Sequence, residues 1–349
     1  MKNDNNPIQF IYWFSNYHLD SPSVRYRAYY PLQYFKKYKG VNSYLVIPGY
    51  SFSKIIQFFK AYFSALLFRK SGSLIVIQKV QSNFIYARLL KFLIRIRKTN
   101  TIYDLDDADY MEKNPKTIYY FARHCAKISG GSQQIISHLT KMNNRAVHTT
   151  SPVVNLNIVK QKRNEVFTIG WIGGFAGEHK ITITELVFPA IKKLDFPLKL
   201  TLIGVIKPED KEFVISYFKN HTQIEIEIPI ISDWNNEEAI QHQIALFDVG
   251  IATLTNSELQ VSKSGIKAKQ YLNNGVPVLS SPLPENNQFI TEGINGYFCS
   301  TENDFSDKLN LFYQMSFSEY DRFIENSRKS IVHFDHDHYF NDFIKLARL

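Results

Sequence analysis

Residues Asp248 to Phe298 read DVGIATLTNSELQVSKSGIKAKQYLNNGVPVLSSPLPENNQFITEGINGYF and carry the clearest pattern in the sequence. This stretch opens with an apolar run, Asp248–Ala252, which predicts a buried strand. A helix is predicted over Gly265–Asn273, where Gly275 ends it just before the next strand, Val276–Ser280. A strand, a helix and a second strand in this order predict a parallel βαβ unit.

The same alternation continues outward over the whole chain in two series. The first series has predicted strands at Ile8–Phe14, Ser43–Ile47, Leu74–Gln78, Thr101–Leu105 and Lys127–Ser129, and helices at Arg25–Tyr38, Lys54–Arg69, Asn83–Arg97 and Gln133–Met142. The second adds strands at Phe167–Ile172, Leu198–Ile203 and Ile224–Ile228, helices at Ile181–Leu194, Glu209–Lys219 and Glu237–Leu246, and a helical tail over Asp304–Leu349. We therefore expect an α/β protein with two doubly wound, Rossmann-like parallel-sheet domains, residues 1–155 and 156–330, and a final helix over 331–349.

Composition narrows the class of protein. The chain has 349 residues, of which 44% are hydrophobic and 21% charged, as in a soluble globular protein. Its two cysteines, Cys125 and Cys299, are too few for a disulfide scaffold or a cysteine-based zinc finger, so we expect a reduced, cytoplasmic protein. No long uncharged apolar run predicts a transmembrane helix, and the first residues, Met1–Pro7, lack a signal-peptide pattern.

Charge is divided unevenly along the chain. Residues 1–160 carry 23 Lys and Arg against 7 Asp and Glu, whereas residues 161–349 carry 18 against 25. The basic half favours an anionic partner, although ordinary surface charge would also explain it. The apolar and basic stretches Lys54–Lys70 and Asn83–Lys98 fit either helices buried against a sheet or helices lying on an anionic membrane at the inner face of the cell membrane. No nucleic-acid motif is found, so we expect no nucleic-acid partner.

Residues 263–274 predict a phosphate site. Lys263, Ser264 and Gly265 open the predicted helix, and backbone N–H groups at a helix start favour phosphate. Lys267, Gln270 and Asn274 share one face of that helix because they are three and four residues apart. Lys263 and Lys267 add positive charge, so a diphosphate is the expected ligand.

These residues also resemble a known family. The segments Asp-Val-Gly-Ile, Lys-x-x-x-Lys-x-x-Gln-Tyr-Leu-x-x-Gly-Val-Pro-Val and Ser-Pro-x-x-Glu-Asn-Asn, in this order, resemble the donor domain of family 4 ("group 1") glycosyltransferases of the GT-B fold. The resemblance is specific over about 50 residues and weaker over 166–330. It implies that the second domain binds a nucleotide-diphosphate sugar, the first domain faces the acceptor, and the C-terminal helix crosses back to the first domain. It also implies transfer with retention and without a metal or other cofactor, the donor being a UDP- or GDP-sugar.

The loop after Phe167–Ile172 matches the family in part. In the family this loop contributes an Arg and, six residues later, a Lys that bind the donor diphosphate. Lys180 matches the Lys, Gly174 stands where the Arg would be, and Gly173 precedes it in the same glycine-rich turn. Lys263 and Lys267 would then compensate for the missing Arg.

Two family glutamates are also replaced. The resemblance places Gln270 at the ribose, where its amide still donates and accepts hydrogen bonds, and Ser262 beside the sugar, where a carboxylate is lost. Glu258 or Glu285 would be substitutes. Glu285, Asn286 and Asn287 follow a strand, so they are either sugar or phosphate contacts or an ordinary turn.

Two stretches of the first half are candidate acceptor residues. The run Tyr103–Asp109 holds four carboxylates, which fit a capped solvent loop, a metal-binding Asp-x-Asp, or, as favoured here, a site in which Asp106 or Asp107 orients the acceptor hydroxyl or accepts its proton. Arg25 and Arg27, after Ser23 at the start of the first helix, would bind an anionic acceptor, or they are ordinary surface arginines. The histidines of His333–His338 match no metal spacing and predict a turn into the last helix.

The function expected is transfer of a sugar to a glycan or lipid-linked acceptor in the synthesis of bacterial surface polysaccharide or glycoconjugates. Lys180 and Lys263 would stabilise the charge that develops on the leaving diphosphate. The alternative is a non-catalytic protein of this fold that binds a nucleotide, a glycan or a partner glycosyltransferase. The absent carboxylate at Ser262 and the absent Arg at Gly174 motivate that alternative.

Overall fold

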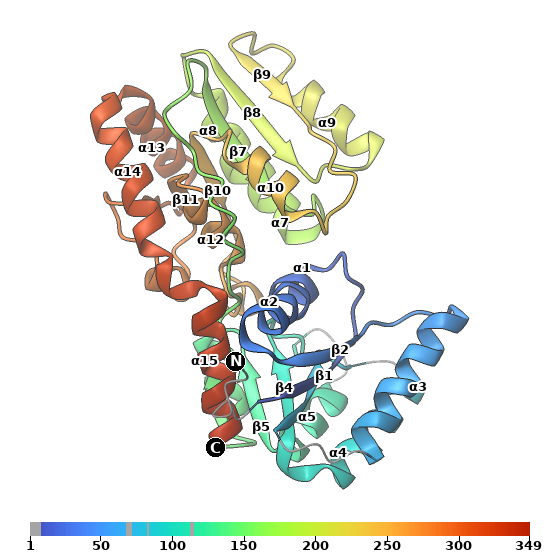
Figure 1. The fold of residues 1–349 in the computed structure, drawn as a ribbon. Helices are drawn as coiled ribbons and strands as arrows, with labels where there is room; N and C mark the ends of the chain where they lie inside the picture. Colours follow the sequence, from blue (N-terminus) through green and yellow to red (C-terminus); the bar gives the residue numbers. More distant parts are fainter. Residues whose placement is uncertain (1–7, 68–71, 82–83, 112–114) are drawn as a thin grey trace. The chain divides into compact units, whose positions relative to one another are not determined.

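Two six-stranded sheets, each entirely parallel, organise the chain in this computed structural model (Figure 1). The structure describes residues 8–67, 72–81, 84–111 and 115–349. By its contacts the chain divides into two units. Unit 1 consists of Met1–Val154, Ser262–Ser264 and Phe334–Leu349, and unit 2 consists of Asn155–Val261 and Gly265–His333.

The sheet of unit 1 has the strand order β2-β1-β3-β4-β5-β6. Its strands are β1 (Phe10–Ser15), β2 (Asn42–Val46), β3 (Ser73–Gln78), β4 (Thr101–Leu105), β5 (Lys127–Gly130) and β6 (Ala146–His148). The central strands β3, β4 and β5 are buried along their whole length. Only β3 reads as a continuous apolar run, whereas β4 and β5 also carry the buried polar residues Asp104, Lys127 and Ser129.

Helices cover both faces of this sheet. Those of unit 1 include α1 (Pro22–Val24), η1 (Arg25–Tyr29), α2 (Tyr30–Lys39), α3 (Phe52–Leu67), α4 (Phe84–Ile96), η2 (Lys98–Asn100), α5 (Pro115–His124), α6 (Gln133–Leu139) and α15 (His336–Arg348). Side chains of β1 alternate between the faces: the Trp13 ring lies 5.7 Å from Phe343 of α15, whereas Phe14 lies 6.1 Å from Phe58 of α3. The last helix of the chain is thus part of the core built on its first strand.

The sheet of unit 2 has the order β12-β11-β10-β7-β8-β9. Its strands are β7 (Phe167–Ile172), β8 (Leu198–Ile203), β9 (Ile224–Glu227), β10 (Val249–Ala252), β11 (Val278–Ser280) and β12 (Gly296–Phe298). Its longer helical segments are α7 (Gly177–Thr182), η3 (Ile183–Val187), α8 (Phe188–Lys192), α9 (Pro208–Phe218), α10 (Glu237–Ile244), α12 (Ile266–Asn273), α13 (Glu302–Gln314) and α14 (Phe317–Ser330). The reversal of strand order at β7 and β10 is the doubly wound switch beside which such sheets bind ligands.

The predicted α/β fold with two Rossmann-like parallel-sheet domains and a C-terminal helix is confirmed. The sequence interpretation omitted the strands β6 and β12 and the helix α5. The predicted ends of helices at Arg69 and Asn83, like Met1–Pro7, lie outside the described residues. The histidine-rich segment is the predicted turn into the last helix, since Asp335 caps α15 through the N–H of His338.

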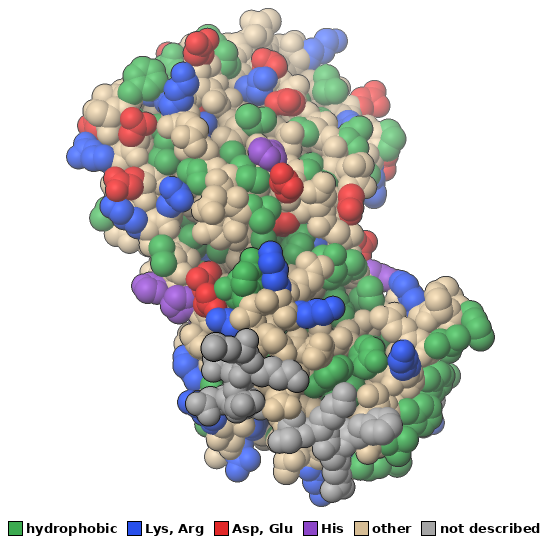
Figure 2. Space-filling view, viewed as in Figure 1, with side chains coloured by type: hydrophobic (Ala, Val, Ile, Leu, Met, Phe, Trp, Pro, Cys, Tyr) green, Lys and Arg blue, Asp and Glu red, His purple; other side chains and the backbone are tan. Residues whose placement is uncertain are grey.

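The outer side of α3 keeps hydrophobic side chains exposed. Phe52 is 78% exposed and Phe63 is 50% exposed, while Ala61, Tyr62 and Ala65 on the inner side are buried. Figure 2 shows hydrophobic side chains gathered along the edge of unit 1 where Figure 1 places α3. No helix within the described ranges has the length and apolar character needed to span a membrane.

Candidate functional site

In unit 1, Arg27 and Asp104 form a fully buried ion pair at the carboxyl end of β4. The Arg27 Nε atom donates to Asp104 Oδ2 at 3.0 Å, and both side chains are 0% exposed. The guanidinium also donates to Ser129 Oγ at 3.0 Å and to Thr149 Oγ1 at 2.9 Å. Burial alone would lower the pKa of Arg27, but the Asp104 charge and hydrogen bonds outweigh it and raise that pKa. This arrangement fixes the first helix to β4, β5 and the chain after β6.

This geometry gives the predicted acceptor arginines another role. All five donors of a guanidinium point in fixed directions, and those of Arg27 are directed at groups inside unit 1. Arg25 is also buried, at 4% exposure, and lies over the Tyr26 ring. Acceptor binding by Arg25 and Arg27 stays a prediction without support from this arrangement, because neither side chain reaches the surface.

A second buried cation, Lys79, neutralises the carboxylates that follow β4. Its Nζ atom lies 2.5 Å from Asp107 Oδ2, and 3.3 Å from both Asp106 Oδ1 and Asp109 Oδ2. The Lys79 side chain is only 4% exposed. Burial lowers its pKa and the three carboxylates raise it, with the net result well above the ordinary value. The acidic run is therefore an ion-paired cluster, and no metal-ligand cluster is found among the described residues.

The backbone of Lys79 adopts a left-handed conformation with φ of 51°, which is uncommon for a residue other than Gly, Asn or Asp. Such conformations persist where the surroundings hold them. Asp107 is the most accessible of the three carboxylates, at 27% exposure, and Lys263 Nζ lies 4.0 Å from its other oxygen. Lys263 thus groups with the carboxylates of unit 1, although the sequence interpretation placed it at the helix start of the donor site.

In unit 2, Tyr271 of α12 holds β7 and β10 together at their carboxyl ends. Its hydroxyl accepts from the backbone N–H of Ile172 at 3.0 Å and donates to the carbonyl of Ile251 at 3.1 Å. The ring can approach because β10 carries Gly250, where a Cβ would lie 2.4 Å from the Tyr271 ring. The same helix carries the predicted donor residues, so Tyr271 fixes their position relative to the strand ends.

Lys267 lies against the glycine turn that follows β7. Its Nζ atom is 4.9 Å from the centre of the Trp171 ring and 3.2 Å from His179 Nδ1. A Cβ on Gly173 would lie 2.9 Å from that Nζ atom, so the glycine makes room for the ammonium group. Two of the predicted donor residues, Gly173 and Lys267, are thereby brought together by the fold.

Lys180 is directed elsewhere. Its Nζ atom forms a 2.6 Å ion pair with Asp210 of α9 and lies over the rings of Phe175 and Phe213. The Lys180 side chain is 38% exposed, so this pair is accessible to solvent. Diphosphate binding by Lys180 stays a prediction and would require it to exchange Asp210 for the ligand.

The start of α12 meets the loop after β11. Gly265 caps the helix with φ of 67°, and a Cβ there would lie 2.3 Å from Asn286 Oδ1. Asn286 is 2% exposed and donates from Nδ2 to Ser280 Oγ at 2.7 Å, while its Oδ1 atom has no hydrogen-bond partner among the described residues. The backbone N–H groups at the start of α12 and this buried oxygen form a polar cradle beside the strand ends.

The remaining predicted residues fall into three groups. Gln270 and Glu285 are buried, at 7% and 2% exposure, and Glu285 accepts from Gln288 at 2.9 Å. Gly174 and Asn287 are exposed, and a Cβ on Gly174 would meet nothing within 4 Å. Ser262 and Ser264 belong to unit 1, where Ser264 Oγ lies 3.3 Å from Ser151 Oγ.

Several residues of these clusters were missed by the sequence interpretation. Lys79 directly follows β3, so the rule that ligands bind beyond strand ends would have selected it. Glu178, at the start of α7, accepts from Thr255 and Ser257 in the loop after β10, the latter at 3.0 Å. No spacing in the sequence predicts these contacts, because the partners are distant along the chain.

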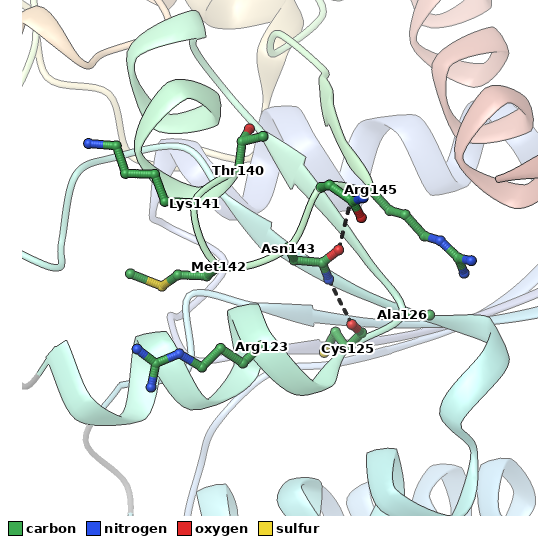
Figure 3. A pocket seen from close by; sticks show the side chains of 9 residues that line it. Arg123, Cys125, Ala126, Thr140, Lys141, Met142, Asn143 and Arg145 are labelled. Carbon is green, nitrogen blue, oxygen red and sulfur yellow. Dashed lines mark hydrogen bonds between the residues drawn. The ribbon is translucent and has the colours of Figure 1, made fainter.

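A shallow pocket of about 510 Å³ lies at the opposite, amino-terminal edge of the unit 1 sheet (Figure 3). Asn143 occupies its floor and donates to the carbonyls of Ala122 and Cys125 at 3.2 and 3.0 Å. Arg123, Lys141 and Arg145 contribute its basic rim. Because the polar groups of Asn143 are used within the fold, we assign no function to this pocket.

No sequence family and no curated protein matches this chain. Solved structures do match it along nearly its full length. The structure of Anabaena HepE in complex with UDP-glucose has a TM-score of 0.68 at 11% identity, covering 97% of this chain and 100% of that one. The chain has the GT-B fold.

Two further GT-B structures agree. A glycosyltransferase from Rickettsia africae has a TM-score of 0.66 at 12% identity, covering 97% of this chain and 98% of that one. The lipopolysaccharide outer core galactosyltransferase WaaB has a TM-score of 0.62 at 14% identity, covering 98% and 100%. At these identities the likeness establishes the GT-B fold of this chain, and its activity has to be argued from its own residues.

Proposed function

We propose that this chain is a glycosyltransferase that transfers a sugar from a nucleotide-diphosphate donor to a glycan or lipid-linked acceptor. The observation that carries the proposal is the cradle at the strand ends of unit 2. There Lys267 lies against Gly173, and α12 begins at Gly265 beside the buried oxygen of Asn286. The similar structure bound to UDP-glucose and the one named as a galactosyltransferase add support.

The donors of the cradle, which are the Lys267 ammonium group and the N–H groups at the start of α12, fit a diphosphate leaving group, whereas the Asn286 oxygen is an acceptor and does not bind phosphate. Transfer breaks the bond between the anomeric carbon and the diphosphate oxygen, forms a bond to the acceptor oxygen, and releases the acceptor proton. Lys267 and the N–H groups at the start of α12 would stabilise the negative charge on the departing oxygen. Gln270 would bind the ribose hydroxyls. We further propose retention of the anomeric configuration and no requirement for a metal, both of which rest on the resemblance of residues 248–298.

Donor binding is tested by thermal shift with UDP, GDP, CMP, UDP-sugars and GDP-sugars, because a ligand of the folded state raises the melting temperature. The variants are Lys267→Met and Lys180→Ala, with Lys219→Ala, an exposed lysine after α9, as the control. We expect one nucleotide class to stabilise the wild type and the control, and to stabilise Lys267→Met least. Stabilisation by none of these ligands would contradict the proposal.

Transfer is tested separately with the donor identified in this way. Incubation with candidate acceptors in EDTA, followed by NMR of the anomeric proton of the product, reports turnover, metal dependence and stereochemistry together. Retained configuration in EDTA is expected. An inverted product would overturn the proposal of retention, and activity only with added divalent cation would overturn metal independence.

The alternative, a non-catalytic GT-B protein, is favoured by one observation. Ser262 replaces a family carboxylate, and it is fully buried in unit 1. A chain of this kind would still bind a nucleotide but would not turn it over. Sugar transfer by the wild type at a rate above that of Lys267→Met would rule out the non-catalytic alternative.

A further inference from the structure

The outward side of α3 presents an unbroken apolar stripe. Its members recur every three or four residues, so they lie on one side of the helix. They are Phe52, Ile55, Ile56, Phe59 and Phe63, with exposures of 78%, 42%, 51%, 41% and 50%. Rings of Phe59 and Phe63 stack at 5.9 Å, which extends the stripe as one surface. An apolar side chain in water is ordinary when isolated, but a contiguous patch marks an interaction surface.

The neighbouring helix α4 widens this surface. The hydroxyl of Tyr62 in α3 donates to the carbonyl of Leu89 in α4 at 3.1 Å, which places the helices side by side. Phe92 and Ile96 of α4 are 51% and 44% exposed. We name the apolar stripe of α3, together with Phe92 and Ile96 of α4, the α3/α4 face.

The charged side chains that the described parts of α3 and α4 carry are all positive. No Asp or Glu occurs between Asp20 and Asp104, a span that contains both helices. The exposed basic residues are Lys60 of α3, Arg88 and Arg95 of α4, and Lys98 just after it. Lys91 lies among them, and burial together with the charges of Arg88 and Arg95 lowers its pKa, as expected where cations are crowded.

We propose that the α3/α4 face docks this chain on an anionic lipid bilayer. Apolar side chains of the stripe enter the boundary between headgroups and acyl chains, while the surrounding Lys and Arg contact anionic headgroups. A second copy of this chain is a poor occupant, because a symmetric contact through the same face would bring cations against cations. The proposal goes beyond sugar transfer, and lipid binding is measured without a donor.

Co-sedimentation tests the proposal with the full chain and vesicles of pure phosphatidylcholine or of phosphatidylcholine and phosphatidylglycerol in equal parts. Phe59→Ser/Phe63→Ser removes apolar contact, and Arg88→Glu/Arg95→Glu reverses charge. The matched controls in unit 2 are Ile206→Ser/Ile230→Ser, at residues 70% and 79% exposed, and Lys207→Glu/Lys219→Glu. We expect binding to the anionic vesicles alone, weakened by at least about tenfold in each α3/α4 variant and unchanged in the controls.

Insertion is measured independently by fluorescence. Phe63→Trp places a reporter on the stripe, and Ile230→Trp is the control. Lipids brominated on the acyl chain are expected to quench additional fluorescence only in Phe63→Trp. No binding to anionic vesicles, or equal quenching of both reporters, overturns the proposal. The proposal is also overturned if the chain does not bind vesicles but forms a concentration-dependent dimer, and if Phe59→Ser/Phe63→Ser abolishes that dimer. If Phe59→Ser/Phe63→Ser unfolds, Arg88→Glu/Arg95→Glu and Phe63→Trp still test the proposal.

Discussion

Arg27 and Asp104 are 77 residues apart in the sequence, yet they form a two-pronged ion pair with no exposed surface. The pair lies at the carboxyl end of the unit 1 sheet, where ligands of such sheets bind. Its hydrogen bonds to Ser129 and Thr149 make it the polar centre of unit 1.

Removing one partner of this pair leaves a buried charge uncompensated. Arg27→Met or Asp104→Leu is therefore expected to lower the free energy of unfolding by about 3–5 kcal/mol. The double variant Arg27→Met/Asp104→Leu is expected to lose less than the sum of the two, since neither charge remains. Urea titration of the four proteins gives the coupling energy, and simple additivity would show that the pair contributes nothing jointly.

Lys79 holds three carboxylates together. Lys79→Met is expected to cost about 3 kcal/mol or more, because Asp106 and Asp109 stay buried without their cation. Lys79→Arg, which keeps the charge, should retain more of that stability, and the exposed Lys98→Met serves as control. The pKa of Lys79 is raised on folding, so its contribution is complete below the ordinary lysine pKa and is lost only as pH rises through the folded value. Constant stabilisation by Lys79 relative to Lys79→Met from pH 7 to pH 9 is the expected profile.

Two glycines of unit 2 make a matched pair for testing the cradle. Gly265→Ala forces a Cβ against Asn286 at φ of 67°, so it should cost about 1–3 kcal/mol and reduce nucleotide binding. Gly174→Ala meets nothing within 4 Å, so it should leave the free energy of unfolding unchanged. Thermal melts with and without the nucleotide compare both variants with the wild type. Nucleotide binding by Gly265→Ala equal to that of the wild type would remove the start of α12 from the donor site.

His336 makes the stability of unit 1 depend on pH. Burial lowers its pKa from 6.5 to about 4, so the unfolded chain takes up a proton that the folded chain excludes. The stability is present above pH 6.5 and is lost as pH falls toward 4, by about 2 kcal/mol between pH 7 and pH 5. His336→Phe, whose ring keeps the contact with Tyr34, should abolish this part of the slope. The exposed His242→Gln should leave it intact, and a slope unchanged in His336→Phe would refute the assignment.

The fold was predictable because short strands and longer helices alternate along the whole chain. The predicted strands Thr101–Leu105, Phe167–Ile172 and Leu198–Ile203 match β4, β7 and β8 residue for residue. The strands β6 and β12 were not predicted, because a strand of three residues at the edge of a sheet is too short to show a hydrophobic pattern.

The site was predictable only in part. Gly265, Lys267 and Asn286 lie close together in sequence, and their strand-helix-strand context indicated the cradle. The pairs Arg27–Asp104 and Lys180–Asp210 could not be predicted, because they join residues of separate elements whose side-chain directions depend on packing. A role for Lys79 could have been predicted from its position, because it directly follows the predicted strand Leu74–Gln78.

The placement of α15 determines when unit 1 can be completed during synthesis. Tyr339, Phe340, Phe343 and Leu346 belong to the same core as Trp13 and Phe35, so that core lacks one wall until α15 has left the ribosome. Unit 2 ends at His333, before α15 is made. Unit 2 therefore has all of its residues before unit 1 does, and a stop codon just before α15 would leave a finished unit 2 attached to an open unit 1.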